Sequence, residues 1–323
     1  MLNRRDLFVL GAAAGIALSP VAYAQSSFPD RPIRIVVPYA SGSGTDNTAR
    51  HFSQRVAMAT GWTVIVDNKP GGNAFIGIND VLRSPADGYT LLYTGGSTHG
   101  VNSALFKKLP YDPLRDFVPV APALFSPMVL LASPSLNVKT AAELVDLIRK
   151  NPGKYSAATG SPFQQLAVNL LRQQGKLDFQ DVQYKGSGQS MTDLLGGHVD
   201  FTMVDGAAAM PQVHGGKLKA LAVTSKRRVA AFPSTPTMAE AGLPDIQLNG
   251  WAGLFAKTGT PEPVLGKIRE VFNAYFQSAE YKQFLDANAG FYEDLSPAQM
   301  MDFIRSEIAR AQSTFQRAGI EPQ

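Results

Sequence analysis

Short apolar runs alternate with helical patterns along most of this chain, and this alternation constrains the fold more than any other feature. Extended runs occupy residues 33–38, 63–66, 89–94, 155–158, 182–184, 199–204 and 218–224, and amphipathic stretches separate them. Strands that alternate with helices are typical of parallel α/β sheets, because parallel neighbours need a long crossover between them. The sequence therefore predicts an α/β protein.

Two longer extended segments predict how this α/β chain is divided. Residues 117–133 form a long apolar segment, and residues 246–256 form a second one. If the first leaves one set of strands and the second returns to it, two open sheets are joined by two hinge crossings. We expect lobe 1 to hold residues 25–125 and 247–323, and lobe 2 to hold residues 126–246. Small ligands usually bind in the cleft between such lobes.

Three sequence signals predict where helices begin. Thr140 and Glu143 form a capping box that opens a helix over residues 141–150, and Thr237 and Glu240 form a second box. A Ser-Pro-x-Gln pattern at residues 296–299 opens the last helix. We expect the chain to be helical throughout from Pro261 onward.

The N-terminus has the composition of a signal peptide. Arg4 and Arg5 precede an uncharged apolar stretch over residues 7–18, and Ala22-Tyr23-Ala24 supplies small residues for cleavage. The stretch is shorter than the roughly 20 residues of a membrane-spanning helix. The sequence therefore predicts cleavage after Ala24 and a soluble protein in the periplasm. Because the arginine pair also resembles a twin-arginine motif, the Sec and twin-arginine routes both stay open.

Loops of small residues follow four of the predicted strands. They occupy residues 39–46, 95–100, 159–162 and 185–188, and each precedes a helical pattern. Glycine lets the backbone turn its N–H groups outward, serine and threonine add hydroxyl donors, and a helix start adds unpaired N–H groups. Such loops bind anions with neutral groups. We therefore expect loops from both lobes to hold a small carboxylate in the cleft.

The motifs of enzymes and nucleic-acid binders are missing from the sequence. There is no cysteine, no serine with glycine at both G-x-S-x-G positions and no nucleotide-binding glycine pattern. The four histidines are scattered, with only His99 in a candidate loop, and the net charge of +4 is small. We expect no catalytic residue, no metal, no cofactor and no nucleic-acid partner. Asp46 and Asp205 both follow strands and leave a periplasmic hydrolase or isomerase as an alternative.

Several motifs, in order along the chain, resemble one known family. They are FPDRPIRIVVP at residues 28–38, GTD at 44–46, NKPG at 68–71, DGYTLL at 87–92, YKG at 184–186 and LAVTS at 221–225. Over nearly all of residues 28–323 the chain is similar to the Bug receptors, the substrate-binding components of tripartite tricarboxylate transporters. The loop over residues 41–44 reads Ser-Gly-Ser-Gly, where that family usually has a Pro-Gly-Gly-Gly-like sequence.

This resemblance implies a two-lobed periplasmic-binding-protein fold of type II-like architecture that closes on a carboxylate. The partners it implies are a small carboxylate and, transiently, integral-membrane transporter subunits, and we expect a monomer. The loop after the first strand and a facing loop of lobe 2 would grip the ligand, and Tyr39, Phe75 or Phe163 would shape the pocket. The predicted ligand-binding residues are Tyr39, Ser41, Gly42, Ser43, Thr45, Asp46, Asn73, Ser97, Thr98, Thr159, Gly160, Ser161 and Asp205.

Two other functions stay open at the level of the sequence. A periplasmic hydrolase or isomerase would use Asp46 or Asp205 as its base. A ligand-sensing partner of a membrane kinase would bind the same acid but deliver it to no transporter.

Overall fold

A computed structural model describes residues 28–243 and 246–323 of the chain. The predicted signal peptide, residues 1–24, lies outside the described residues. Within the described residues, no helix is both long and apolar enough to cross a membrane.

One sheet of nine strands runs through the described part of the chain, in the order β2-β1-β3-β9-β4-β7-β5-β6, with β8 paired to β4. At one end of this order β1 is parallel to β2 and β3, and at the other end β5 is parallel to β6 and β7. The strands are β1 Ile33–Val37, β2 Val64–Asn68, β3 Thr90–Gly95, β4 Phe117–Ala132, β5 Ser156–Thr159, β6 Gln180–Gln183, β7 Phe201–Asp205, β8 Lys219–Val223 and β9 Asn249–Lys257.

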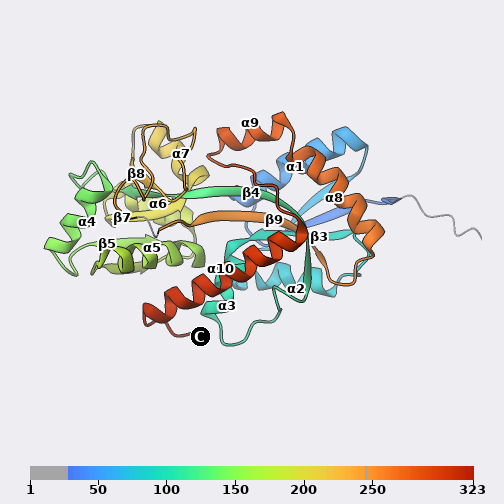
Figure 1. Cartoon of the computed structure of the whole chain (residues 1–323), viewed down its shortest axis with the longest axis horizontal. Helices are drawn as coiled ribbons and strands as arrows, with labels where there is room; N and C mark the ends of the chain where they lie inside the picture. The colour runs from blue at the N-terminus through green and yellow to red at the C-terminus, as the bar shows by residue number, and fades with distance from the viewer. Residues whose placement is uncertain (1–27, 244–245) are drawn as a thin grey trace, which may run out of the picture.

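Strands β4 and β9 join the two ends of the sheet. The 16-residue β4 pairs antiparallel with β9 over Phe117–Pro127 and then with β7 and β8 over Met128–Ala132. Figure 1 shows the two strands side by side across the middle of the molecule, with α4, α5 and α6 on one side and α1, α2 and α8 on the other. We call these sides the second half and the first half. The crossings therefore fall where the two long apolar segments predict them.

Helices cover both faces of each half. The α-helices are α1 Gly44–Thr60, α2 Phe75–Arg83, α3 Asn102–Leu105, α4 Ala141–Lys150, α5 Pro162–Gly175, α6 Ser187–Gly196, α7 Gly206–His214, α8 Glu262–Phe276, α9 Ala279–Ala287 and α10 Pro297–Arg317. Two short turns of helix, η1 Gly72–Ala74 and η2 Ser97–Val101, follow β2 and β3.

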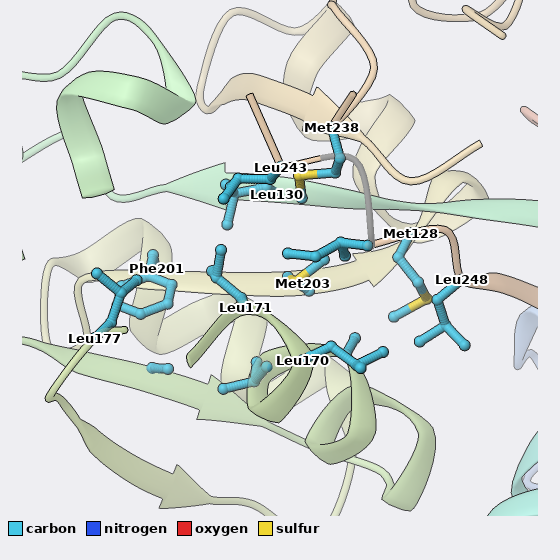
Figure 2. Close-up of a cluster of buried hydrophobic side chains, with 14 of the residues drawn as sticks. Met128, Leu130, Leu170, Leu171, Leu177, Phe201, Met203, Met238, Leu243 and Leu248 are labelled. Carbon is cyan, nitrogen blue, oxygen red and sulfur yellow. The ribbon is translucent and has the colours of Figure 1, made fainter. Parts of the chain in front are cut away.

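Both faces of the inner parallel strands β1 and β3 are buried, which explains their continuous apolar runs. In β1, Ile35 and Val37 belong to a cluster with α1 and α8, whereas Val36 belongs to a cluster on the other face with α2 and α10. The second half has two further clusters, one of which is shown in Figure 2 with Met128 and Leu130 of β4 and Leu170 and Leu171 of α5. Each half therefore has its own core.

Helix α10 packs against both halves. Its first turns place Met300 and Ile304 in a first-half cluster, and its later turns place Ala311 and Phe315 in the main second-half cluster. In addition, Gln173 of α5 donates from Nε2 to the backbone oxygen of Thr314 at 2.7 Å. Figure 1 shows α10 lying across the middle of the molecule. The link between the halves therefore includes this helix as well as the two strands.

The predicted helix starts have three different outcomes. The box at residues 296–299 has both of its bonds. Thr140 accepts from Glu143 N, but the Glu143 carboxylate accepts from Lys139 N instead of Thr140 N. Thr237 and Glu240 make both box bonds, yet they close a turn and no helix follows. The expectation of a helical tail from Pro261 onward was wrong over residues 288–296, which form an irregular connection between α9 and α10.

Candidate functional site

The loop between β1 and α1 is organised by one buried carboxylate. Asp46 is 1% exposed, and its oxygens accept from Gly42 N at 2.8 Å and Asn68 Nδ2 at 2.9 Å, while Arg50 Nε lies 3.0 Å away. Burial alone would raise the pKa of Asp46, but the bonds from Gly42, Arg50 and Asn68 outweigh it and leave this pKa below its ordinary value. The carboxylate therefore holds the loop together.

The same loop leaves the first N–H groups of α1 available. Ser43 caps the helix by accepting from Asp46 N at 3.2 Å, which satisfies the third N–H of α1. The N–H groups of Gly44 and Thr45 precede it and have no partner within the helix. Gly42 has a φ of +81°, a left-handed conformation that glycine adopts without strain. Ser41 and Gly42 are exposed, so the turn faces solvent.

The segment after β3 contributes a buried hydroxyl network. The Tyr39 hydroxyl lies 3.4 Å from Thr94 Oγ1, which lies 2.8 Å from Thr98 Oγ1. Thr98 and His99 are fully buried, and Ser97 is half-buried. Thr98 is therefore connected to the Tyr39 hydroxyl through Thr94 and is shielded from solvent, whereas Ser97 is partly accessible to solvent.

His99 belongs to the core of the first half. Its ring stacks on Phe255 with centroids 4.3 Å apart, and Nδ1 lies 3.1 Å from Thr98 Oγ1. Burial lowers the pKa of His99 to about 3, so the ring is neutral at physiological pH. Of the described residues, none bonds Nε2. Its place in a glycine-rich loop made His99 a candidate, but the ring points inward.

In the second half, the loops after β5 and β6 press against each other. A Cβ placed on Gly160 would lie 2.6 Å from the carbonyl carbon of Gly186, so only glycine fits there. Ser161 caps α5 by accepting from Gln164 N at 3.2 Å, and the Thr159 hydroxyl donates to Asp181 at 2.9 Å. The predicted residues Thr159, Gly160 and Ser161 therefore lie directly beside the start of α6.

The start of α6 has no side-chain cap. Its N-cap residue is Gly186, in extended backbone geometry, and no side-chain bond satisfies the N–H groups of the first turn. A Cβ on Gly186 or Gly188 would meet no atom within 4 Å. These N–H groups are the positive end of the helix dipole, and Ser187 N lies beside Gly160 in the loop that opens α5.

Asp205 lies where the second half meets the first. It is half-buried, it caps α7 by accepting from Ala208 N at 3.0 Å, and burial raises the pKa of its carboxyl. The next residue, Gly206, donates from its N–H to Ser126 Oγ at 3.2 Å, and Ser126 donates to the backbone oxygen of Ala289 at 3.3 Å.

Contacts across the two halves bring most of these loops together. A Cβ on Gly96 would lie 2.7 Å from the Phe163 ring, and one on Gly250 would lie 3.9 Å from the same ring. Phe163, at the start of α5, therefore sits between the loop after β3 and strand β9. We call the set formed by the ends of β1, β3, β5 and β6 and the helix starts that follow them the loop band.

Asn73 is less directly connected to the loop band. It is exposed with a φ of +54°, and its backbone oxygen accepts from Asn102 Nδ2 at 3.2 Å. Asn102 also donates to the Tyr111 hydroxyl, which donates to the backbone oxygen of Thr98 at 2.6 Å. Phe75, the next aromatic residue, packs on Phe106 and Tyr111.

A hollow of about 850 Å³ lies between the two halves but away from the loop band. Its walls include Phe125 and Asn249 of the crossing strands, residues 225–230 of the second half, and residues 290–293 and Phe303 of the first. Phe303, which lines this hollow, packs on Phe125 and Trp251 with ring centroids 5.6 and 5.4 Å away. Because Trp251 Nε1 also lies 3.3 Å from a Cβ placed on Gly96, Trp251 contacts both the wall of the hollow and the loop band. None of the thirteen predicted residues lines this hollow, which we call the hinge crevice.

Sequence reasoning missed Gln164. This residue is 3% exposed, and its side chain bonds Gly160 N at 2.5 Å and Ser187 Oγ at 2.9 Å. It stands at the fourth position of a Ser-Pro-x-Gln pattern, residues 161–164, identical to the one at residues 296–299. The pattern indicates a helix start, and the direction of the glutamine side chain depends on a loop 23 residues away.

In residues 28–243 and 246–323, no group of three or more His, Cys, Asp or Glu side chains is arranged to hold a metal ion. The donors of the loop band are backbone N–H groups and hydroxyls. Such groups bind an anion rather than a cation.

Comparison with known proteins gives the family. A family profile described as "Tripartite tricarboxylate transporter family receptor" matches residues 48–320. Protein BugT of Bordetella pertussis is 33% identical over 312 residues, which cover 95% of each chain.

Two solved structures with bound acids are also similar to the chain. Rpa4515 of R. palustris with adipate is 30% identical, with a TM-score of 0.86 over 92% of this chain and 100% of that one. MatC of Rhodopseudomonas palustris with bound malate is 30% identical, with a TM-score of 0.80 over 89% of this chain and 99% of that one. The chain therefore belongs to the tripartite tricarboxylate transporter receptor family, and it is a two-lobed periplasmic solute-binding receptor of the TctC/Bug type, not an enzyme.

Proposed function

We propose that this receptor captures a small mono- or dicarboxylate in the loop band and delivers it to integral-membrane transporter subunits. The observation that carries the proposal is the uncapped start of α6, which lies against the loop that opens α5. Two relatives of the same fold hold adipate and malate. A carboxylate in the band would replace its hydration shell with hydrogen bonds worth about 1.5–3 kcal/mol each.

The donors lie on both halves of the molecule. The second half offers the N–H groups at the start of α6 and that of Phe163 in the first turn of α5, and the first half offers those of Gly44 and Thr45 together with the Ser41 hydroxyl. A dicarboxylate could use one set for each end. We propose that the halves, residues 25–125 with 247–323 and residues 126–246, close on it about β4 and β9.

Ten of the thirteen predicted residues take different parts in this proposal. Ser41, Gly42, Thr45, Gly160 and Ser161 would surround the ligand. Ser43 and Asp46 would shape the first loop, Thr98 would hold Tyr39, and Asp205 would lie at the junction of the halves.

Isothermal titration calorimetry tests the capture step. Adipate, malate and a series of other carboxylates should give saturable heat with one site per chain, and the matching neutral diamides should give none. Absence of binding by every carboxylate would remove the proposal. Small-angle scattering should show a more compact protein with ligand than without it.

Delivery, oligomeric state and export need separate experiments. Pull-down of membrane subunits should depend on the bound acid, whereas capture of a membrane kinase instead would favour the sensor alternative. Analytical ultracentrifugation should give a monomer. The mass of the protein recovered from the periplasm should correspond to cleavage after Ala24.

A further inference from the structure

Two identical sequence patterns open helices in this protein but use their glutamines differently. At residues 296–299 the Gln299 side chain accepts from Ser296 N at 2.9 Å and completes a capping box on its own helix. At residues 161–164 the Gln164 side chain leaves its own cap residue and bonds Gly160 and Ser187. Residues 296–299 therefore show what this pattern does when it only starts a helix, and residues 161–164 can be compared with them.

The Gln164 side chain joins the two loops through one donor and one acceptor. Its Oε1 accepts from Gly160 N at 2.5 Å, and its Nε2 donates to Ser187 Oγ at 2.9 Å. Because Gln164 is only 3% exposed, water cannot readily replace either partner. The starts of α5 and α6 are therefore held at a fixed spacing by a neutral group.

We propose that Gln164 is a positioning residue for the ligand: it sets the start of α6 against the start of α5 so that their N–H groups address one carboxylate. The inference rests on the proposed function for the identity of the ligand. An amide suits this role because it satisfies both loops without a negative charge, whereas a carboxylate at the same place would repel the bound acid.

Substitution of Gln164 by Met and by Glu tests the two parts of this inference. Met has a similar length but makes neither bond, and Glu can accept from both Gly160 N and the Ser187 hydroxyl while adding a charge. Gln299→Met and Gln299→Glu are the matched controls, since they alter the same pattern at a helix start remote from the loop band. Adipate and malate serve as probes.

We expect Q164M to weaken binding by about 10-fold, the effect of losing one well-placed charged hydrogen bond, and Q299M to change it less than about 2-fold. Q164E should bind at least about 10-fold more weakly than wild type at pH 7, and this ratio should shrink as the pH falls and the introduced carboxylate is protonated. A merely structural role predicts that Q164M loses thermal stability but keeps its affinity for adipate and malate, and that result would overturn the inference.

Hydrogen exchange gives a readout that needs no ligand. In the free protein, the Gly160 amide donates to Gln164 Oε1, so it should exchange about 10-fold faster in Q164M than in wild type, and Q299M should leave it unchanged. Unchanged exchange in Q164M would overturn the inference whatever the ligand is. Failure of wild type to bind any carboxylate, with exchange altered as expected, would instead remove the proposed function and leave the positioning of the loops established.

Discussion

At the residue scale, the buried titratable groups of the loop band support the structure and do not act as bases. The Asp46 carboxylate accepts from three groups of the first loop and its neighbours. The His99 ring is stacked in the core. Their sequence positions, one after a strand and one in a glycine-rich loop, cannot show this, because burial depends on β9 and other elements far along the chain.

Substitution of Asp46 by Asn should destabilise the protein. The Asn amide would face donors from Gly42, Asn68 and Arg50, so the free energy of unfolding at pH 7 should fall by about 1–3 kcal/mol. Because the pKa of Asp46 is lowered on folding, this stability is present above about pH 4 and is lost as the pH falls through the lowered pKa. Urea denaturation at a series of pH values checks this.

The control for that substitution is Asp302→Asn. Asp302 pairs with Arg305 on the exposed face of α10, where both side chains are more than half exposed. Such surface pairs contribute about 0–1 kcal/mol. Equal losses of stability for D46N and D302N would contradict the role given to Asp46.

Substitution of His99 by Phe should alter the pH dependence of stability. The pKa of His99 is lowered to about 3 on folding, so its contribution to stability is complete above about pH 6.5 and is lost progressively as the pH falls from there toward 3. In this range the free energy of unfolding of wild type should fall by about 1.4 kcal/mol more per pH unit than that of H99F. If the free energy of unfolding depends on pH equally in the two proteins, the ring is not buried as described. Urea denaturation at a series of pH values measures this dependence.

At the element scale, sequence patterns located most strands and helices because each has a strong local signal. The continuous apolar run of β1 and the box at Ser296 are examples. Patterns failed where the outcome depends on distant partners. The Thr237–Glu240 box closes a turn instead of a helix, and the contacts of Gly96 with Phe163 and of Gly160 with Gly186 join segments that no spacing rule connects.

Helix α6 gives a prediction at this scale, because its missing cap can be supplied. Gly186 has extended backbone geometry and open space at its Cβ position, so Gly186→Ser should fit without strain. The new hydroxyl should stabilise the helix by a few tenths of a kcal/mol, as N-cap serines do. The same hydroxyl should accept from an N–H group that we assign to the ligand. The affinity for adipate should therefore fall several-fold, the effect of losing about one hydrogen bond.

The control for this change is Gly186→Ala, which adds a Cβ but no acceptor. Calorimetry and thermal melting of both variants separate the effects. If Ser and Ala lower the affinity equally, occupation of the N–H group is not the cause.

At the scale of the whole molecule, the hinge crevice carries opposite charges on its two walls. Lys226 and Arg227 line it from the second half, and Asp286 and Glu293 line it from the first. The two walls belong to different halves, so movement of the halves about β4 and β9 should change the distance between these charges. Attraction between the walls should therefore favour the form in which the crevice is narrower.

Reversal of the charges on one wall tests this. Lys226→Glu with Arg227→Glu should change ligand affinity by about 2- to 5-fold at low ionic strength, because exposed pairs contribute about 0.2–1 kcal/mol each. A rise would show that the crevice is narrower in the open form, and a fall that it is narrower in the closed form. The change should fade in high salt, which screens such pairs. Calorimetry at two ionic strengths measures both effects, and Lys217→Glu, an exposed site outside the crevice, is the control. A change in affinity that does not depend on salt would point to another cause.

The placement of α10 limits how the halves can move. A helix rooted in two hydrophobic cores resists sliding, since each shift would pull Met300 or Phe315 out of its contacts. Closure about β4 and β9 should therefore keep α10 in contact with both cores. A drug or antibody that binds this helix would then change the angle between the halves without contacting the solute.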